Sequence, residues 1–294
     1  MPHNAQAARG TSFLNTDLQE YSRPAVAGRA ARLLATVRAQ KPLVQNITNF
    51  VAMDITANML LAIGASPAMV HGIEEVPEFV QLASALVINT GTLSQPWVDS
   101  MLVAAEAAGL RKLPWVLDPV GAGATSYRNA AVARLLALKP AIIRGNASEI
   151  LAVARIAGIS AGMARPKGVD SAHGTAEAED MAMALARHQN CIVAATGAVD
   201  VVTDGACLIR LGNGDALMTQ VTALGCALSA MAGAFAAATP DMLEAAVAAI
   251  AVYGVAGEMA ARQARGPGSF RVAFLDCLHN MGEDDLKQWL KVLA

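Results

Sequence analysis

Charged residues are scarce in this chain, and neither sign predominates. Its 294 residues include 22 Lys and Arg against 24 Asp and Glu, and charged residues make up only 16% of the sequence. No basic block interrupts it, so nothing in the composition supports nucleic-acid binding. Hydrophobic residues reach 54%, which excludes an intrinsically disordered chain and supplies a large core. We therefore expect a globular protein that binds no nucleic acid.

The chain also lacks the patterns of a metal-stapled or secreted protein. It has no C-x-x-C pair and no His pair at metal-ligand spacing, which argues against structural zinc and a disulfide framework. Residues 1–24 contain no apolar run typical of a signal peptide. We expect these residues to form a flexible extension, residues 25–294 to form a single domain, and the protein to be cytoplasmic.

One uncharged stretch, residues 216–240, is long enough to span a membrane. Its residues are mostly Ala, Gly, Ser and Thr, with few Leu, Ile or Phe, so transfer into lipid would be weakly favourable. We expect a tightly packed buried helix and no membrane insertion.

Short apolar runs alternate with longer helical patterns from residue 41 onward, which predicts an α/β protein. Unbroken apolar runs are typical of parallel strands covered on both faces. We expect strands at residues 43–48, 65–70, 85–91, 115–120, 141–146 and 191–196. We expect helices at residues 49–63, 95–108, 147–157, 175–188, 225–239 and 241–264.

The pattern changes after residue 196, where three shorter runs cover residues 201–205, 207–212 and 216–221. Asn213 and Gly214 join the last two and suit a tight hairpin. We therefore predict antiparallel strands along one edge of a mostly parallel sheet.

Ligands of open α/β sheets bind beyond the carboxyl ends of the strands, so polar residues there are candidates for function. Asp118 follows one strand and precedes Gly121 and Gly123. Ser126 stands where a dinucleotide-binding fingerprint requires a third glycine, so the pattern gives little support for an NAD enzyme. Asp118 is then either a turn carboxylate or a ligand of hydrated Mg²⁺ beside a phosphate.

Two further strands, 141–146 and 191–196, carry or precede polar candidates. Asn146 and Glu149 have the spacing of a capping box, yet Glu149 also suits a metal site. Arg144 leaves an apolar strand, where a buried guanidinium needs an anion such as phosphate. Thr196 either forms a turn or contacts a nucleotide.

The segment at 221–230, VTALGCALSA, predicts a strand that runs through Gly225 into an Ala-rich helix. Free N–H groups at such a helix start favour an anion. Cys226 lies at that start, where the pKa of a thiol tends to fall, although Cys in an Ala-rich helix is also a common buried residue. Neither a Walker loop nor a G-x-S-x-G elbow is present.

Over about residues 40–290 the chain resembles the hydroxyethylthiazole kinase family. The resemblance rests on ordered matches: PLVQNITNFV (42–51), ANMLLAIGASPAMV (57–70), INTGTL (88–93), LDPVGAGAT (117–125), IRGNASEI (143–150), KGVD (167–170), ATGAVDVVTDG (195–205), LGCALSA (224–230) and GPGSF (266–270). It implies a three-layer α/β/α ribokinase-like fold with a mostly parallel sheet. It also implies Mg²⁺-assisted transfer of phosphate from ATP to the hydroxyl of 4-methyl-5-(2-hydroxyethyl)thiazole, in thiamine biosynthesis.

The resemblance also assigns roles to individual positions and implies a homotrimer with active sites between subunits. The implied substrate-binding residues are Asn49, Val51, Met69 and Ala223; the nucleotide-binding residues Arg144 and Thr196; the metal ligands Asp118 and Glu149; and the catalytic residues Gly225 and Cys226. In ribokinase-like relatives an Asp base takes the place of Cys226.

The sequence departs from the family pattern in two places. Residues 222–226 read T-A-L-G-C where the family usually has T-G-x-G-C, so Ala223 replaces a glycine and the bulky Leu224 follows it. Gln45 stands where His is common. A positive φ at Ala223 would cost on the order of 1 kcal/mol. Three alternatives are therefore considered: a related kinase for hydroxymethylpyrimidine or pyridoxal, a catalytically silent metabolite-binding protein, and an NAD-dependent oxidoreductase, which the missing glycine disfavours.

Overall fold

The computed structural model describes residues 21–160 and 173–293, so KGVD (167–170) and most of the expected extension (1–24) lie outside the described residues. A nine-stranded sheet, ordered β2-β1-β3-β4-β5-β6-β7-β8-β9, forms the centre of this part of the chain. Its parallel strands are β1 (Leu43–Ile47), β2 (Ser66–Ala68), β3 (Ala85–Asn89), β4 (Trp115–Asp118), β5 (Ile142–Asn146) and β6 (Ile192–Thr196). All six were predicted, with boundaries that differ by at most two residues.

The register of these strands brings the polar strand ends into line. Asn89 pairs with Asp118 across β3 and β4, and Asn146 pairs with Thr196 across β5 and β6. In β3 and β4 the buried apolar residues are followed by a buried polar residue where the strand ends, Asn89 and Asp118. These candidate functional residues therefore lie together at the carboxyl end of the parallel strands.

Antiparallel pairing completes the sheet, as predicted, but one predicted strand is wrong. The antiparallel strands are β7 (Asp200–Thr203), β8 (Leu208–Leu211) and β9 (Val292–Leu293). Residues Ala216–Gln220 form a 3₁₀ helix, η2, because Asp215 caps it by accepting the N–H of Leu217 at 2.9 Å. The predicted hairpin at Asn213 and Gly214 is also absent. The buried Asn213 side chain instead donates hydrogen bonds to the Glu258 carboxylate and the Trp289 carbonyl.

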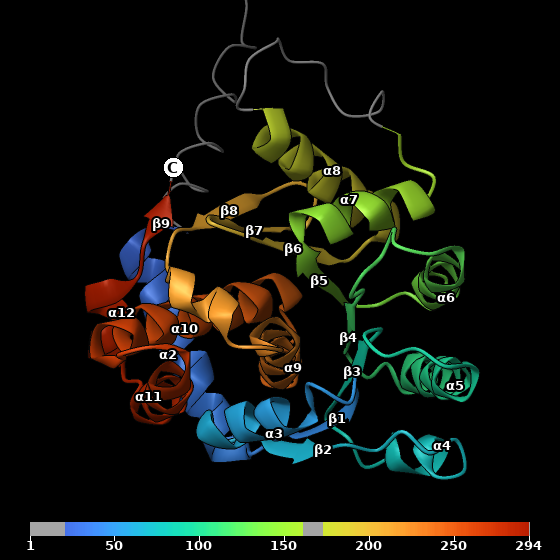
Figure 1. The fold of residues 1–294 in the computed structure, drawn as a ribbon, viewed down its shortest axis with the longest axis horizontal. Coiled ribbons are helices and arrows are strands. Elements are labelled where there is room, and N and C mark those ends of the chain that lie inside the picture. The colour runs from blue at the N-terminus through green and yellow to red at the C-terminus, as the bar shows by residue number, and fades with distance from the viewer. Residues whose placement is uncertain (1–20, 161–172, 294) are drawn as a thin grey trace, which may run out of the picture.

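Helices cover both faces of the sheet, so the predicted three-layer α/β/α fold is confirmed (Figure 1). One face carries α4 (Val76–Phe79), α5 (Gln95–Arg111), α6 (Ser126–Leu136), α7 (Ala147–Ile156) and α8 (His173–Gln189). The other carries α2 (Arg23–Gln40), α3 (Met53–Ala62), α9 (Leu224–Ala236), α10 (Met242–Gln263), α11 (Pro267–Asn280) and α12 (Glu283–Trp289). Helix α2 begins at Arg23, so the last two residues of the expected extension are helical.

Small residues let α9 lie directly on the sheet. A Cβ at Gly233 would stand 2.6 Å from Cγ2 of Val87, so only glycine permits this approach. The expected strand before α9 is absent: residues 221–223 form a turn, and Ala223 has φ 62. Within the described residues one helix, α10, is long and apolar enough to cross a membrane, but 78% of its apolar window is buried, as in a core helix.

Candidate active site

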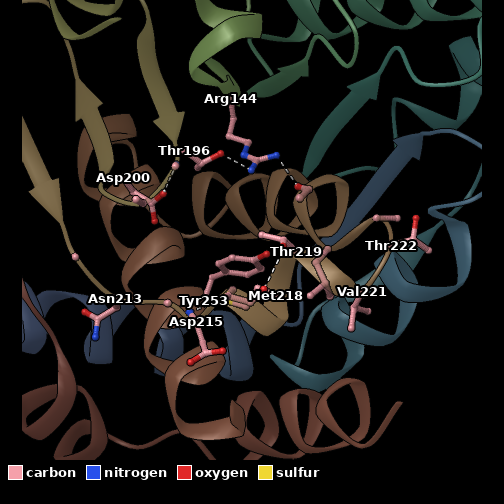
Figure 2. Close-up of a pocket in the computed structure, with 18 residues that line it drawn as sticks. Arg144, Thr196, Asp200, Asn213, Asp215, Met218, Thr219, Val221, Thr222 and Tyr253 are labelled. Carbon is pink, nitrogen blue, oxygen red and sulfur yellow. Dashed lines mark hydrogen bonds between the residues drawn. The ribbon is translucent and has the colours of Figure 1, made fainter. Parts of the chain in front are cut away.

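A cavity of about 790 Å³ opens at the carboxyl ends of β5 and β6 and extends over the start of α9 (Figure 2). Four of the predicted site residues line it, namely Arg144, Thr196, Ala223 and Gly225. Its volume falls in the range of small-molecule and cofactor sites. The structure thus brings the predicted nucleotide residues and the glycine-containing loop into one hollow.

Arg144 joins the sheet to the start of α9. Its guanidinium donates to the Thr196 hydroxyl at 2.6 Å and to the Gly225 carbonyl at 2.9 Å. The side chain is 9% exposed, and its Nε has no partner among the described residues. No carboxylate within salt-bridge distance neutralises it in the described part of the chain, as the ion pairs there involve other residues. A buried cation with unused donors is suited to an anionic ligand.

Asp118 is the most deeply buried carboxylate of the site. Its Oδ2 accepts hydrogen bonds from Asn89 Nδ2 at 2.7 Å and Ser229 Oγ at 2.8 Å, while Oδ1 has no partner among the described residues. Burial raises the pKa of Asp118 to about 6, although nearby Arg144 lowers it in part. Two donors on one oxygen leave the other for a ligand outside the protein.

Asn49 links this network to Cys226. Its Nδ2 donates to Asn89 Oδ1 at 2.8 Å and approaches Cys226 Sγ at 3.4 Å. Its Oδ1 accepts the N–H groups of Val51 and Ala52 at 3.1 and 3.0 Å. The Asn49 side-chain amide therefore holds the start of α3 and contacts the Cys226 thiol at the same time.

Of the two alternatives for Cys226, the lowered thiol pKa of a helix start is not found. Burial raises the pKa of Cys226, and the neighbouring Asp118 carboxylate raises it further. The hydrogen bond from Asn49 acts in the opposite direction but does not prevail. Desolvation outweighs the helix N-terminus here, so the thiol is protonated at neutral pH.

The loop before α9 has the positive φ at Ala223 whose cost was considered from the sequence. Ala223 adopts φ 62, a left-handed conformation that L side chains rarely take. At Gly225 the backbone lies so close to Arg144 that a Cβ would stand 2.9 Å from Nη1. A side chain at 225 would therefore displace the Arg144 guanidinium, and alanine is strained at 223 by its conformation.

Glu149 has the structural role that its spacing predicted. It completes the capping box of α7: Asn146 Oδ1 accepts the Glu149 N–H at 2.9 Å, and Glu149 Oε2 accepts the Asn146 N–H at 2.8 Å. Its Oε1 also accepts the N–H of Gly121 at 2.9 Å, which ties α7 to the loop after β4. This carboxylate acts on the pKa of Asp118, so the two implied metal ligands are electrostatic neighbours.

Val51 and Met69 follow β1 and β2 and are not among the residues that line the cavity. Val51 is 58% exposed beside Phe50, which is 66% exposed. Gln45, in place of the common His, is buried and donates to the Val70 carbonyl at 3.3 Å. Of these residues, Val51 contacts Asn49, whose Oδ1 accepts its N–H at 3.1 Å.

Sequence comparison decides the family. The pattern of the hydroxyethylthiazole kinase family matches residues 34–284. The chain belongs to this family. It is 56% identical over 266 residues to a protein of Cereibacter sphaeroides named hydroxyethylthiazole kinase, covering 90% of this chain and 99% of that one. A protein of the same name from Rhizobium leguminosarum bv. trifolii is 54% identical and covers 89% and 96% of the two chains.

Solved structures agree with this assignment. A hydroxyethylthiazole kinase protein from Pyrococcus horikoshii superposes with a TM-score of 0.83 at 42% identity, covering 90% of this chain and 98% of that one. The pyridoxal kinase of Staphylococcus aureus, in complex with AMP-PCP and pyridoxal, gives a TM-score of 0.53 at 15% identity over 74% and 88% of the chains. The second likeness concerns the fold alone.

Sequence reasoning missed four residues of this family member's site. Asn89 ends an apolar strand just as Asp118 does, so the search for polar residues at the carboxyl ends of strands could have found it. Asp200 follows a turn, and its carboxyl accepts the Gly197 N–H at 3.0 Å. Ser229 and Tyr253 lie within apolar helices, where no local pattern distinguishes them from core residues.

Proposed function

We propose that this chain transfers the γ-phosphoryl group of ATP to the primary hydroxyl of 4-methyl-5-(2-hydroxyethyl)thiazole, a step of thiamine biosynthesis. Family membership supports both the reaction and the acceptor. The structural observation that carries the proposal is Arg144. Its buried guanidinium has no carboxylate partner among the described residues, bonds to the loop that starts α9 and lines the cavity of about 790 Å³.

Charge stabilisation and positioning do most of the work in phosphoryl transfer, and this site supplies both. Arg144 and Thr196 hold the nucleotide phosphates in the proposed complex. The N–H of Ala227 is already bonded to the Ala223 carbonyl at 3.0 Å, so the amides available to an anion are those of residues 224–226.

Substrate binding is proposed for Asn49, Val51, Met69 and Ala223, and catalytic positions for Gly225 and Cys226. Asn49 and Cys226 are already in contact, so an alcohol bound over them would reach the start of α9. A protonated thiol is a weak base, but a loose transition state requires little proton removal before phosphoryl transfer.

The residues present fit a hydrated Mg²⁺. The unpartnered, buried Oδ1 of Asp118 offers one oxygen ligand, and Glu149 would act through water because both of its oxygens already accept backbone N–H groups. No cluster of three or more His, Cys, Asp or Glu occurs in the described residues, which matches an ion that keeps most of its waters. When bound, Mg²⁺ would neutralise charge on the phosphate oxygens.

A homotrimer with sites between subunits is proposed for the assembled protein. The exposed apolar pair Phe50 and Val51 directly follows Asn49, so a neighbouring subunit placed there would both bury apolar surface and close the substrate side. Light scattering of the wild type and of Val51→Glu tests this: the trimer predicts loss of association in the variant, and a monomeric wild type contradicts it. The cytoplasmic location and the division into residues 1–24 and 25–294 stay predictions.

Product analysis tests the proposed reaction. Purified protein is incubated with MgATP and the thiazole alcohol, and the thiazole phosphate is followed by mass spectrometry. Parallel reactions contain hydroxymethylpyrimidine or pyridoxal. Product from another alcohol alone would keep the fold and change the substrate, whereas binding of the thiazole without turnover would favour a silent metabolite-binding protein.

A further inference from the structure

Tyr253 of α10 is a buried side chain whose hydroxyl has no hydrogen-bond partner among the described residues. It is 8% exposed and lines the cavity of about 790 Å³. The fully buried polar atoms that lack a partner among the described residues do not include this hydroxyl, so it is open to the cavity that Tyr253 lines. A ligand in the cavity can therefore be its hydrogen-bond acceptor.

The Tyr253 ring packs against α11. Its edge packs on Phe274, with ring centroids 5.3 Å apart and planes at 85°. Gly254 and Gly257 follow on the same helix, and a Cβ there would stand 2.9 Å from Asn213 Cβ or 2.4 Å from Met218 Sδ. These glycines let residues 213–218 lie against α10 and form the wall of the cavity beside Tyr253.

The charges of Arg144 and Asp200 act on the Tyr253 hydroxyl. In the view of Figure 2 the ring lies between Arg144 and Asp215. Burial raises the pKa of Tyr253, Arg144 lowers it in part, and Asp200 and Cys226 raise it. The phenol is therefore neutral and able to donate its proton in a hydrogen bond.

We propose that Tyr253 is a nucleotide-binding residue whose hydroxyl donates a hydrogen bond to a phosphate oxygen of the bound nucleotide. The proposal deepens the proposed function and rests on it for the position of the nucleotide. A phosphate oxygen is the fitting acceptor because the guanidinium of Arg144 and the free amides at the start of α9 line the same cavity. Tyr253 would add a neutral donor to these charged and backbone donors.

The substitution Tyr253→Phe tests this role because it removes only the hydroxyl. Titration calorimetry should give a Kd for MgADP and MgATP about tenfold higher than that of the wild type, because one hydrogen bond to a charged group is lost. The affinity for adenosine should be unchanged. In turnover assays KM for ATP should rise about tenfold at nearly constant kcat. Tyr127→Phe, at a tyrosine 45% exposed on α6, is the matched control and should change nothing.

Stability separates this role from a structural one. Because the hydroxyl bonds no described residue, Tyr253→Phe should unfold at an equal or higher denaturant concentration than the wild type. Unchanged affinity for MgADP and MgATP, or an equal loss for adenosine, would overturn the proposal. Since calorimetry involves no acceptor alcohol, a protein that binds MgATP but does not phosphorylate the thiazole would refute the proposed function without deciding the role of Tyr253.

Discussion

The amide of Asn89 donates a 2.7 Å hydrogen bond to Asp118, the residue directly opposite it in the sheet. The same amide accepts from Asn49 at 2.8 Å through its oxygen, so its orientation is fixed at both ends. Its oxygen also accepts the N–H of Gly91 at 3.0 Å. Asn89 thus connects the proposed acceptor side of the site with the proposed metal side.

Replacement of Asn89 by Ala should lower kcat/KM at least tenfold. The variant leaves Asn49 without its acceptor and Asp118 with one donor, so the free energy of unfolding should also fall by about 1–3 kcal/mol. Steady-state kinetics and urea unfolding measure the two effects. Ser229→Ala removes the other donor to Asp118 without touching Asn49, and should cost stability but less activity. Equal losses of activity in both variants would contradict a linking role for Asn89.

Removal of the Arg144 side chain should lower kcat/KM at least tenfold, because the phosphates would lose their buried cation. Arg144→Ala is compared with Arg155→Ala. The control removes an exposed guanidinium from the last turn of α7, the helix that follows the strand of Arg144. The control should be as active as the wild type. Turnover by Arg144→Ala within twofold of the wild type would remove Arg144 from the site.

Cys226→Asp should retain activity. A carboxylate at this position accepts a hydrogen bond from Asn49 as the thiol does, and it is a stronger base than a thiol whose pKa burial has raised. Circular dichroism establishes whether the variant is folded, and product formation measures its activity. A folded but inactive protein would disprove the idea that Cys226 takes the place of a base.

Ala223→Gly should stabilise the protein by about 0.5–1 kcal/mol, because glycine adopts a positive φ without a Cβ clash. The matched control is Ala230→Gly within α9, where the same change should destabilise by about 1 kcal/mol. Urea unfolding of the two variants gives effects of opposite sign if the strain at Ala223 is real. A loss of stability at both positions would contradict it.

Asp200 makes the stability depend on pH. Burial raises its pKa from 3.8 to about 6, with opposing contributions from the Gly197 N–H and Arg144. An acid with a higher pKa in the folded state binds more protons when folded, so its contribution to stability is lost as the pH rises from about 4 to about 6. Asp200→Asn should therefore gain up to about 3 kcal/mol over the wild type between pH 4 and pH 7. A difference that is constant with pH would refute this.

The sheet was predictable because most of its strands are short apolar runs followed by polar residues. The same pattern predicted that Asp118 and Arg144 lie on buried strands, where a charged group needs a partner. The capping box of Asn146 and Glu149 depends only on local spacing, and the structure contains it.

The remaining features depend on contacts between distant segments. Residues 216–220 have strand-like composition, yet the Asp215 cap makes them helical. The pKa of Cys226 follows its burial and Asp118, which is 108 positions earlier in the sequence, rather than its place at a helix start. Tyr253 and Ser229 look like core residues in the sequence because only the fold brings their hydroxyls to the site.

A competition assay tests the central claim most directly. Wild-type protein receives MgATP with equal concentrations of the thiazole alcohol, hydroxymethylpyrimidine and pyridoxal, and the initial ratio of the three phosphate products is measured by mass spectrometry. That ratio reports relative kcat/KM. The account predicts that thiazole phosphate predominates by at least a hundredfold and that Arg144→Ala abolishes most of it. Predominance of either other phosphate, or no product from any alcohol, would contradict the account.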